Sequence, residues 1–124
     1  MFKDTKAFSG FSVDDLPKAK AFYSQTLGLE VSESNGNLNI HIAGSNPIVV
    51  YPKPNHTPAS YTILNFPVKN IDQAVDDLTK RGVQFERYGG DIKQNEKGIA
   101  SDDRGPHIAW FKDPAGNIIS VLEV

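Results

Sequence analysis

Few side chains in this sequence could take part in catalysis or bind a metal, and the histidines are the first candidates. The sequence has three histidines and no cysteine, which excludes a thiol nucleophile, a disulfide bond and a thiolate metal site. His41 falls in an alternating strand pattern and His56 among prolines, so structural or surface roles are the default for both. His107 follows Asp102 and Asp103, and an Asp–His pair could act as a general base or bind a metal. No histidine spacing matches a ligand motif such as HExxH, so we predict no catalytic residue, with His107 as the open alternative.

The only tryptophan, Trp110, points to binding rather than to catalysis. An indole ring suits planar ligands, and its N–H group needs a partner when it is buried. Two roles fit the sequence equally well, the wall of a ligand pocket and the filling of a hydrophobic core. Which of the two roles applies depends on the face of the predicted strand on which Trp110 lies.

Trp110 belongs to the closing stretch of the chain, residues 108–124, which predicts two apolar strands joined by a turn. In that turn Pro114 presets φ, Asp113 can accept hydrogen bonds from later backbone groups, and Gly116 tolerates a positive φ. The β-branched side chains of the second strand suit a buried pleated sheet. This stretch therefore predicts a hairpin tied into a sheet.

Composition limits the classes of function. The 124 residues are enough for one domain with a core, and 39% hydrophobic with 23% charged residues is ordinary for a globular protein. The net charge of −2 comes without a basic stripe, so we expect no nucleic-acid binding. No apolar run approaches the ~20 residues of a membrane span. The first residues lack the apolar core of a signal peptide, which favours the cytoplasm.

The order of predicted elements occurs twice along the chain. A strand, a capped helix, a glycine and further strands fall between residues 6 and 52, and the same order follows between residues 61 and 124. Residues 53–60 form a proline-containing linker that fits neither a helix nor a central strand. Phe11 aligns with Phe66 at an offset of 55 residues. We therefore expect a single α+β domain, residues 1–124, built from two β-α-β-β-β units.

Periodicity and turn signals define the elements of each unit. Asn35-Gly36 is a strong hairpin signal, and Asp14 or Asp15 can cap the first helix. The predicted helices are residues 16–27 and 71–81, and the predicted strands are residues 6–13, 29–34, 38–43, 47–51, 61–68 and 83–87, a short strand near 98–100, and the closing pair. Residues 93–104 carry both signs of charge with little to bury, which indicates a solvated loop; a lid is the functional alternative.

This arrangement resembles the vicinal oxygen chelate superfamily, which includes glyoxalase I, the fosfomycin resistance enzymes, the extradiol dioxygenases and the bleomycin resistance proteins. The resemblance runs from residue 7 to residue 124 and is more specific for fold than for function. The matching motifs are Phe22-Tyr23 with Leu27-Gly28-Leu29 at the end of the first helix, and Asp113-Pro114 with Gly116-Asn117 at the final turn.

The resemblance implies curved mixed sheets around a ligand-binding cup, with helices on the outer face, in a homodimer. In the metal-using members four strand residues hold the metal. By local register these positions fall on Phe8, Ile63, Ser120 and either Val49 or Tyr51. None of these side chains is an imidazole, carboxylate or thiolate, which divalent metals need. We therefore expect neither a metal nor a cofactor.

Strand parity predicts which side chains line this cup. Ile108 and Trp110 face it, and Ala109 and Phe111 face the helices. The wall is apolar with sparse polar groups, as in small-molecule sites. The predicted ligand-binding residues are Phe8, Gly10, Tyr51, Ile63, Asn65, Ile108, Trp110, Ile118, Ser120 and Leu122.

We accordingly predict metal-independent binding or sequestration of a small, partly apolar or aromatic molecule, by analogy with the bleomycin resistance proteins. Two alternatives stay open. One is a lyase, isomerase or dioxygenase of the same superfamily that uses acid–base or metal groups from atypical places, such as His107, Asp102 or Asp103. The other is a non-catalytic interaction module whose cup is filled by its own side chains.

Overall fold

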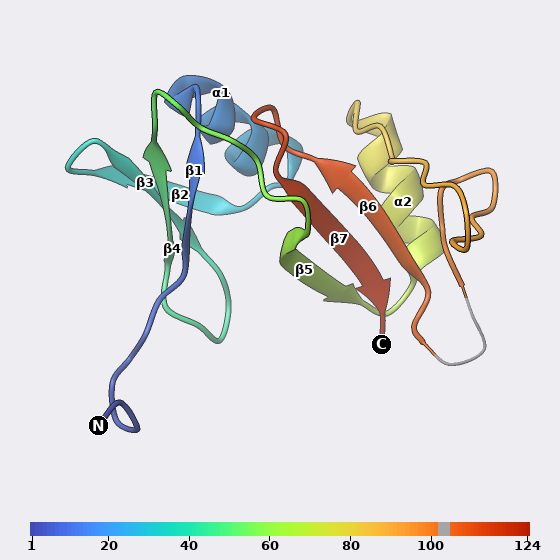
Figure 1. The fold of residues 1–124 in the computed structure, drawn as a ribbon, viewed down its shortest axis with the longest axis horizontal. Helices are drawn as coiled ribbons and strands as arrows, with labels where there is room; N and C mark the ends of the chain where they lie inside the picture. The colour runs from blue at the N-terminus through green and yellow to red at the C-terminus, as the bar shows by residue number, and fades with distance from the viewer. Residues whose placement is uncertain (102–104) are drawn as a thin grey trace. The chain divides into compact units, whose positions relative to one another are not determined.

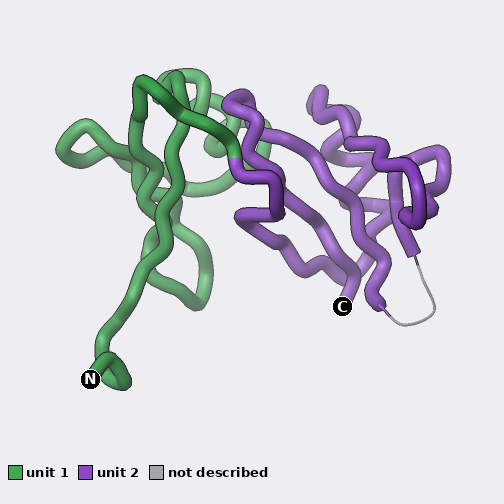
Figure 2. Tube along the Cα trace, viewed as in Figure 1, with its two compact units in different colours: residues 1–58 green, residues 59–124 purple. Residues whose placement is uncertain are grey.

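The computed structural model describes residues 1–101 and 105–124. It divides into two compact units, residues 1–58 and 59–124, each with one mixed sheet and one helical region (Figure 2). The boundary between them lies inside the predicted linker. None of the helices in the described part of the chain is long and apolar enough to cross a membrane.

The first unit contains a four-stranded sheet in the order β1-β4-β3-β2 (Figure 1). β1 pairs in parallel with β4, and the other pairs are antiparallel. Its elements are β1 (Gly10–Val13), α1 (Leu16–Ala21), the π-helix η1 (Phe22–Thr26), β2 (Glu30–Ser34), β3 (Asn37–His41) and β4 (Ile48–Pro52). The predicted hairpin turn connects β2 and β3, with Asn35 at φ 55° and Gly36 at φ 80°. These positive φ values explain the Asn-Gly pair.

One face of this sheet carries the core of the first unit. Val13, Tyr23, Leu38, Ile40 and Val50 are fully buried there, on alternate strand positions and on the helical segment. Full burial of side chains of this size contributes about 1.5–3 kcal/mol each. The opposite face of the sheet remains open.

The helical segment of this unit differs from the continuous helix that the sequence predicted. The Asp15 carboxylate accepts a hydrogen bond from the Lys18 backbone N–H at 3.0 Å, which fixes the start of α1. At Phe22 the segment widens into the π-helix, and the Leu27 N–H donates to the Phe22 carbonyl. Gly28, at φ 72°, ends the segment as predicted.

The second unit contains a three-stranded sheet in the order β5-β7-β6, with α2 beside it (Figure 1). β5 (Thr62–Val68) pairs in parallel with β7 (Ile118–Glu123), and β6 (Ile108–Lys112) pairs with β7 antiparallel. The Asn70 side chain caps α2 (Ile71–Lys80) by accepting from the Gln73 N–H at 3.0 Å. The Ile71 N–H donates to the Glu123 carboxylate at 3.2 Å, which joins the start of α2 to the end of β7.

Two predicted strands of the second unit are reduced to single bridges. The segment 83–87 pairs with β6 only through Phe85 and Phe111, and Ala100 pairs with both Gln94 and Ile108. The prediction of a strand at 83–87 and of a short strand near 98–100 is wrong, because alternation cannot show how many ladder hydrogen bonds a segment makes. The two halves nevertheless share one strand order, since the bridge at Phe85 occupies the place of β2 beside β3.

Candidate functional site

The second sheet has one covered face and one open face. Ala109, Phe111, Ile119 and Val121 are buried, and they alternate with residues that keep part of their surface exposed, except for the fully buried Ser120. Because β7 is central and contacts α2, the buried set packs under the helix. The predicted division of β6, with Ala109 and Phe111 on the helix side, is found in the structure.

Cross-strand pairing places side chains of the open face in rows. Ser120 on β7 pairs with Asn65 on β5 and with Trp110 on β6. Leu122 pairs with Ile108 in the next row, and Ile118 begins the strand on the same face. These residues are six of the ten predicted ligand-binding residues, and they occupy one surface.

Asn65 and Ser120 form the polar centre of the open face. The Ser120 hydroxyl donates to Oδ1 of Asn65 at 2.5 Å, which is at the short end of the range for O–H···O bonds and below the range for N–H···O bonds. Ser120 is fully buried, whereas Asn65 is exposed. The pair therefore turns the Asn65 amide so that its oxygen faces Ser120.

Ile63 does not follow simple strand alternation. The ladder between β5 and β7 shifts register between Thr62 and Leu64, so two steps on β5 match the single step from Ile118 to Ile119. Such a bulge leaves the intervening residue outside the regular pairing and bends the strand. The local register by which the sequence prediction reached Ile63 therefore crosses a shift that strand alternation does not show.

Tyr88 contacts Trp110 from the loop that follows residues 83–87. The two rings lie 5.4 Å apart in an edge-to-face arrangement, which is favourable for aromatic pairs. Burial raises the pKa of the Tyr88 phenol, the neighbouring Glu86 raises it further, and Lys112 lowers it. Lys112 and Glu86 themselves form an ion pair at 3.1 Å. Tyr88 was not among the predicted site residues, and its place in a polar loop gave no signal.

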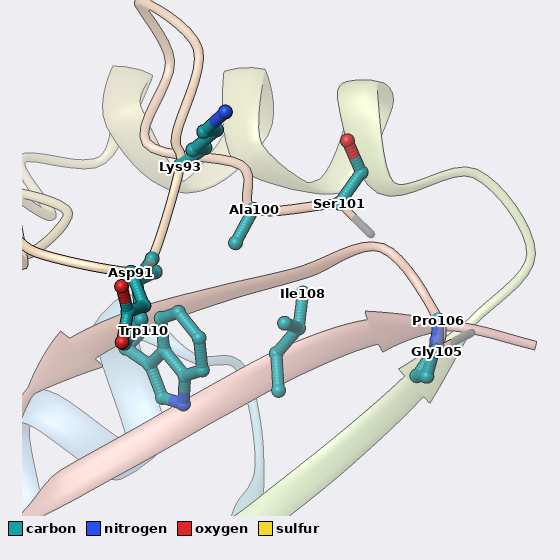
Figure 3. A pocket seen from close by; sticks show the side chains of 9 residues that line it. Asp91, Lys93, Ala100, Ser101, Gly105, Pro106, Ile108 and Trp110 are labelled. Atoms are coloured by element: carbon teal, nitrogen blue, oxygen red, sulfur yellow. The ribbon is translucent and has the colours of Figure 1, made fainter. Parts of the chain in front are cut away.

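A cavity of about 690 Å³ adjoins Ile108 and Trp110 (Figure 3). In Figure 3 these two side chains extend from β6, and the loop residues are arranged around them. Asp91 and Lys93 bring one negative and one positive charge to the wall. The lining residues are Asp91, Ile92, Lys93, Ala100, Ser101, Gly105, Pro106, Ile108 and Trp110.

Gln94 organises the loop that forms this wall. Its amide oxygen accepts from the Tyr88 N–H at 2.7 Å, and its amide nitrogen donates to the Glu86 and Gly98 carbonyls at 2.8 Å each. Ile99 and Ala100 are buried. The prediction of a solvated loop with little to bury is therefore wrong for this part of the segment, because one amide side chain replaces the backbone ladder that a strand would supply.

Charged side chains attach the same loop to its surroundings. Lys97 lies 3.1 Å from Asp76 and 3.5 Å from Asp72, both on α2, and hydrogen bonding to Asp76 raises the pKa of Lys97. The Arg87 guanidinium donates to the carbonyls of Asn95 and Glu96. These contacts connect residues 95–97 to α2 and to the segment before the loop.

Three predicted site residues belong to the first unit, on the open face of its own sheet. Gly10 pairs with Val49, and an added Cβ would meet the Val49 carbonyl oxygen at 3.0 Å, so a larger residue would fit here only tightly. Tyr51 is 40% exposed, and Phe8 is 67% exposed ahead of the strand, which begins at Gly10 rather than at Lys6. A cavity of about 320 Å³ lies here, lined by Lys6, Phe8, Asn39, Asn46, Pro47 and Val49.

The histidines have ordinary partners where the structure describes them. The Ser32 hydroxyl lies 2.8 Å from Nε2 of His41, and the Ser12 hydroxyl lies 2.6 Å from Nδ1 of His56. His107 is exposed, and its carbonyl accepts from the Glu123 N–H. The suggested partners of His107, residues 102 and 103, lie outside the described residues.

The sheet register identifies the uncertain fourth position of the superfamily's metal site. Gly10 pairs with Val49 as Asn65 pairs with Ser120, and Gly10 and Asn65 are related by the 55-residue offset. Val49, rather than Tyr51, is therefore the counterpart of Ser120. The side chains at Phe8, Val49, Ile63 and Ser120 offer no carboxylate, imidazole or thiolate, so they do not fit the family's metal. Residues 1–101 and 105–124 contain no group of three acidic or histidine side chains that could hold a metal ion.

Comparison with known proteins identifies the family. The sequence profile of the Glyoxalase/Bleomycin resistance protein/Dioxygenase superfamily matches residues 8–121. The chain belongs to this superfamily. A search of curated protein sequences finds no match.

Solved structures of this superfamily share the fold. A member from Sphaerobacter thermophilus DSM 20745 has 24% identity and a TM-score of 0.74, with all of both chains covered. TnmS3, an antibiotic-binding protein from Streptomyces sp. CB03234, has 22% identity and a TM-score of 0.71 over 99% of this chain and 98% of its own. FosX, a fosfomycin resistance protein from Listeria monocytogenes, has 18% identity and a TM-score of 0.69 over 95% and 91%.

Proposed function

We propose that this superfamily member binds a small, partly apolar or aromatic molecule without a metal ion, on the open face of its second sheet. The observation that carries the proposal is the partly exposed Trp110 beside a cavity of about 690 Å³. A tryptophan that only filled the core would lie with Phe111 on the helix side, where the side chains are fully buried. A large ring left on an open face is typical of a binding wall.

The composition of the open face supports a binder over an enzyme. Ile108, Ile118 and Leu122 supply apolar surface around Trp110. The positions that the resemblance assigns to a metal carry no carboxylate, imidazole or thiolate. The Ser120 hydroxyl donates to the amide oxygen of Asn65, which is not a base that could activate it as a nucleophile. Such a face can hold a molecule, but it lacks an activated nucleophile or Lewis acid.

The first sheet extends the proposal to Phe8, Gly10 and Tyr51. Phe8 and Tyr51 carry exposed aromatic rings in this unit, and Gly10 lies on the open face of its sheet. Homodimer formation remains a further prediction, tested by the mass of the protein in solution.

The decisive experiment is calorimetric titration of the protein with a panel of aromatic and aliphatic compounds, before and after dialysis against a chelator. We expect at least one aromatic compound to bind stoichiometrically, unchanged by the chelator and without conversion to product. Trp110→Ala should weaken binding about tenfold or more, because it removes both apolar area and ring contacts. Phe2→Ala, at an exposed aromatic in the first unit, is the matched control and should bind as the parent does.

The proposal is wrong if Trp110→Ala binds every compound as tightly as the parent. It is equally wrong if binding requires a divalent metal, or if the bound compound is turned over.

A further inference from the structure

The hydrogen-bonding groups of the open face are directional. The Ser120 hydroxyl donates to Oδ1 of Asn65 at 2.5 Å, so the amide oxygen of Asn65 is turned toward Ser120. The amide nitrogen of Asn65 keeps two N–H donors, and no hydrogen bond between described residues uses them. Asn65 is exposed, so these donors reach the open face.

Trp110 adds a second donor in the same row. Ser120 lies between Asn65 and Trp110 in the sheet register, and directly paired residues have Cβ atoms about 4.5–5.5 Å apart. The indole N–H can only donate, and within the described residues it has no hydrogen-bond acceptor in the protein. The row thus presents N–H groups from both outer strands.

The charged residues near the cavity do not favour a ligand of either charge. Asp91 and Lys93 carry opposite signs on the same wall, so ligand charge is not selected by their sum. The Asn65–Ser120–Trp110 row, in contrast, offers a ligand more hydrogen-bond donors than acceptors, because the groups that face outward are the N–H groups of Asn65 and Trp110.

We propose that the Asn65–Ser120–Trp110 row selects planar aromatic ligands that carry a hydrogen-bond-accepting oxygen, such as an aryl ketone. This inference rests on the proposed binding function and adds the chemical class of the ligand. The ring lies against the apolar part of the face, and the oxygen accepts from Asn65 Nδ2, from Trp110 Nε1 or from both. Ser120 acts as a positioning residue, because its bond to Oδ1 keeps the amide from turning its oxygen outward.

The test compares two probes of one shape, 9-fluorenone and fluorene, which share a planar tricyclic skeleton and differ in the carbonyl oxygen. Equilibrium dialysis measures both affinities. We expect the parent protein to bind fluorenone at least about fivefold more tightly, the effect of one or two hydrogen bonds. Asn65→Asp keeps an acceptor for the Ser120 hydroxyl but replaces the donors with a carboxylate oxygen. It should weaken fluorenone binding about tenfold or more and leave fluorene within about twofold.

Ser120→Ala provides the second variant, which keeps the test valid if Asn65→Asp folds poorly. Without the hydroxyl the amide is free to rotate, and the preference for fluorenone should shrink toward equality. Equal affinities of both probes for the parent, or an unchanged ratio in both variants, would overturn the assignment of ligand class while the proposed binding function stands. Failure of both probes to bind would overturn the assignment of ligand class, while the panel titration decides the proposed binding function.

Discussion

The loop behind the cavity should depend on a single amide side chain. Gln94 makes three hydrogen bonds to backbone groups of Glu86, Tyr88 and Gly98, at 2.7–2.8 Å. Each such bond contributes about 1 kcal/mol net, so Gln94→Ala should remove about 3 kcal/mol from the free energy that keeps this loop closed. Because loops can open without global unfolding, we expect this loss of free energy to appear first as faster hydrogen exchange of the loop amides.

Hydrogen exchange read at the Tyr88 amide is the direct assay. A loss of about 3 kcal/mol corresponds to exchange of the Tyr88 amide that is roughly 100-fold faster. Urea unfolding followed by Trp110 fluorescence should show an equal or smaller loss in the free energy of global unfolding. Gln84→Ala is the matched control, since Gln84 is exposed on the segment just before the loop and such surface changes alter stability by about 0.5 kcal/mol at most. Equal Tyr88 exchange in the two variants would refute the role given to Gln94.

Three further predictions follow from the same unit. Phe111→Ala should cost about 3–5 kcal/mol of unfolding free energy in urea melts, since the ring is fully buried and packs edge-to-face with Phe85 at 5.6 Å; a cost below about 1 kcal/mol would contradict that packing. The raised pKa of Tyr88 means that its contribution to stability is complete below pH 10.0 and is lost as pH rises through the folded value. Tyr88→Phe should therefore flatten the stability decline above about pH 10 in urea melts, and identical pH profiles would refute the shift. Titration with iron, manganese, nickel and zinc should give no stoichiometric tight binding, and one tightly bound metal would overturn the metal-free proposal.

Much of the local structure was predictable because neighbouring residues determine it. Asp15 caps α1, Asn35-Gly36 turns the first hairpin, and Asp113 accepts from the N–H groups of Ala115 and Asn117 at 2.9 Å each. Each of these features is settled within four residues of chain. The residue types at these positions are therefore enough to predict the cap and the turns.

The faces of the strands were predictable for a related reason. Alternation has a period of two, and the apolar pattern of β6 correctly placed Phe111 inward and Trp110 outward. Alternation gave no warning of the register shift beside Ile63, between Thr62 and Leu64. A bulge depends on the partner strand, and the partner is not visible in local sequence.

The tertiary structure alone decided the partners of polar side chains that are distant in sequence. Ser120 donates to Asn65 across 55 residues, and the sequence showed two polar residues without showing that they pair or which atom accepts. Gln94 replaces part of a missing strand by bonding three backbone groups. Such pairings require the sheet to bring separate segments within hydrogen-bond distance. The sequence by itself thus determined the fold class, the turns and the outward position of Trp110, whereas the donor polarity of the candidate site arose only when the strands were paired.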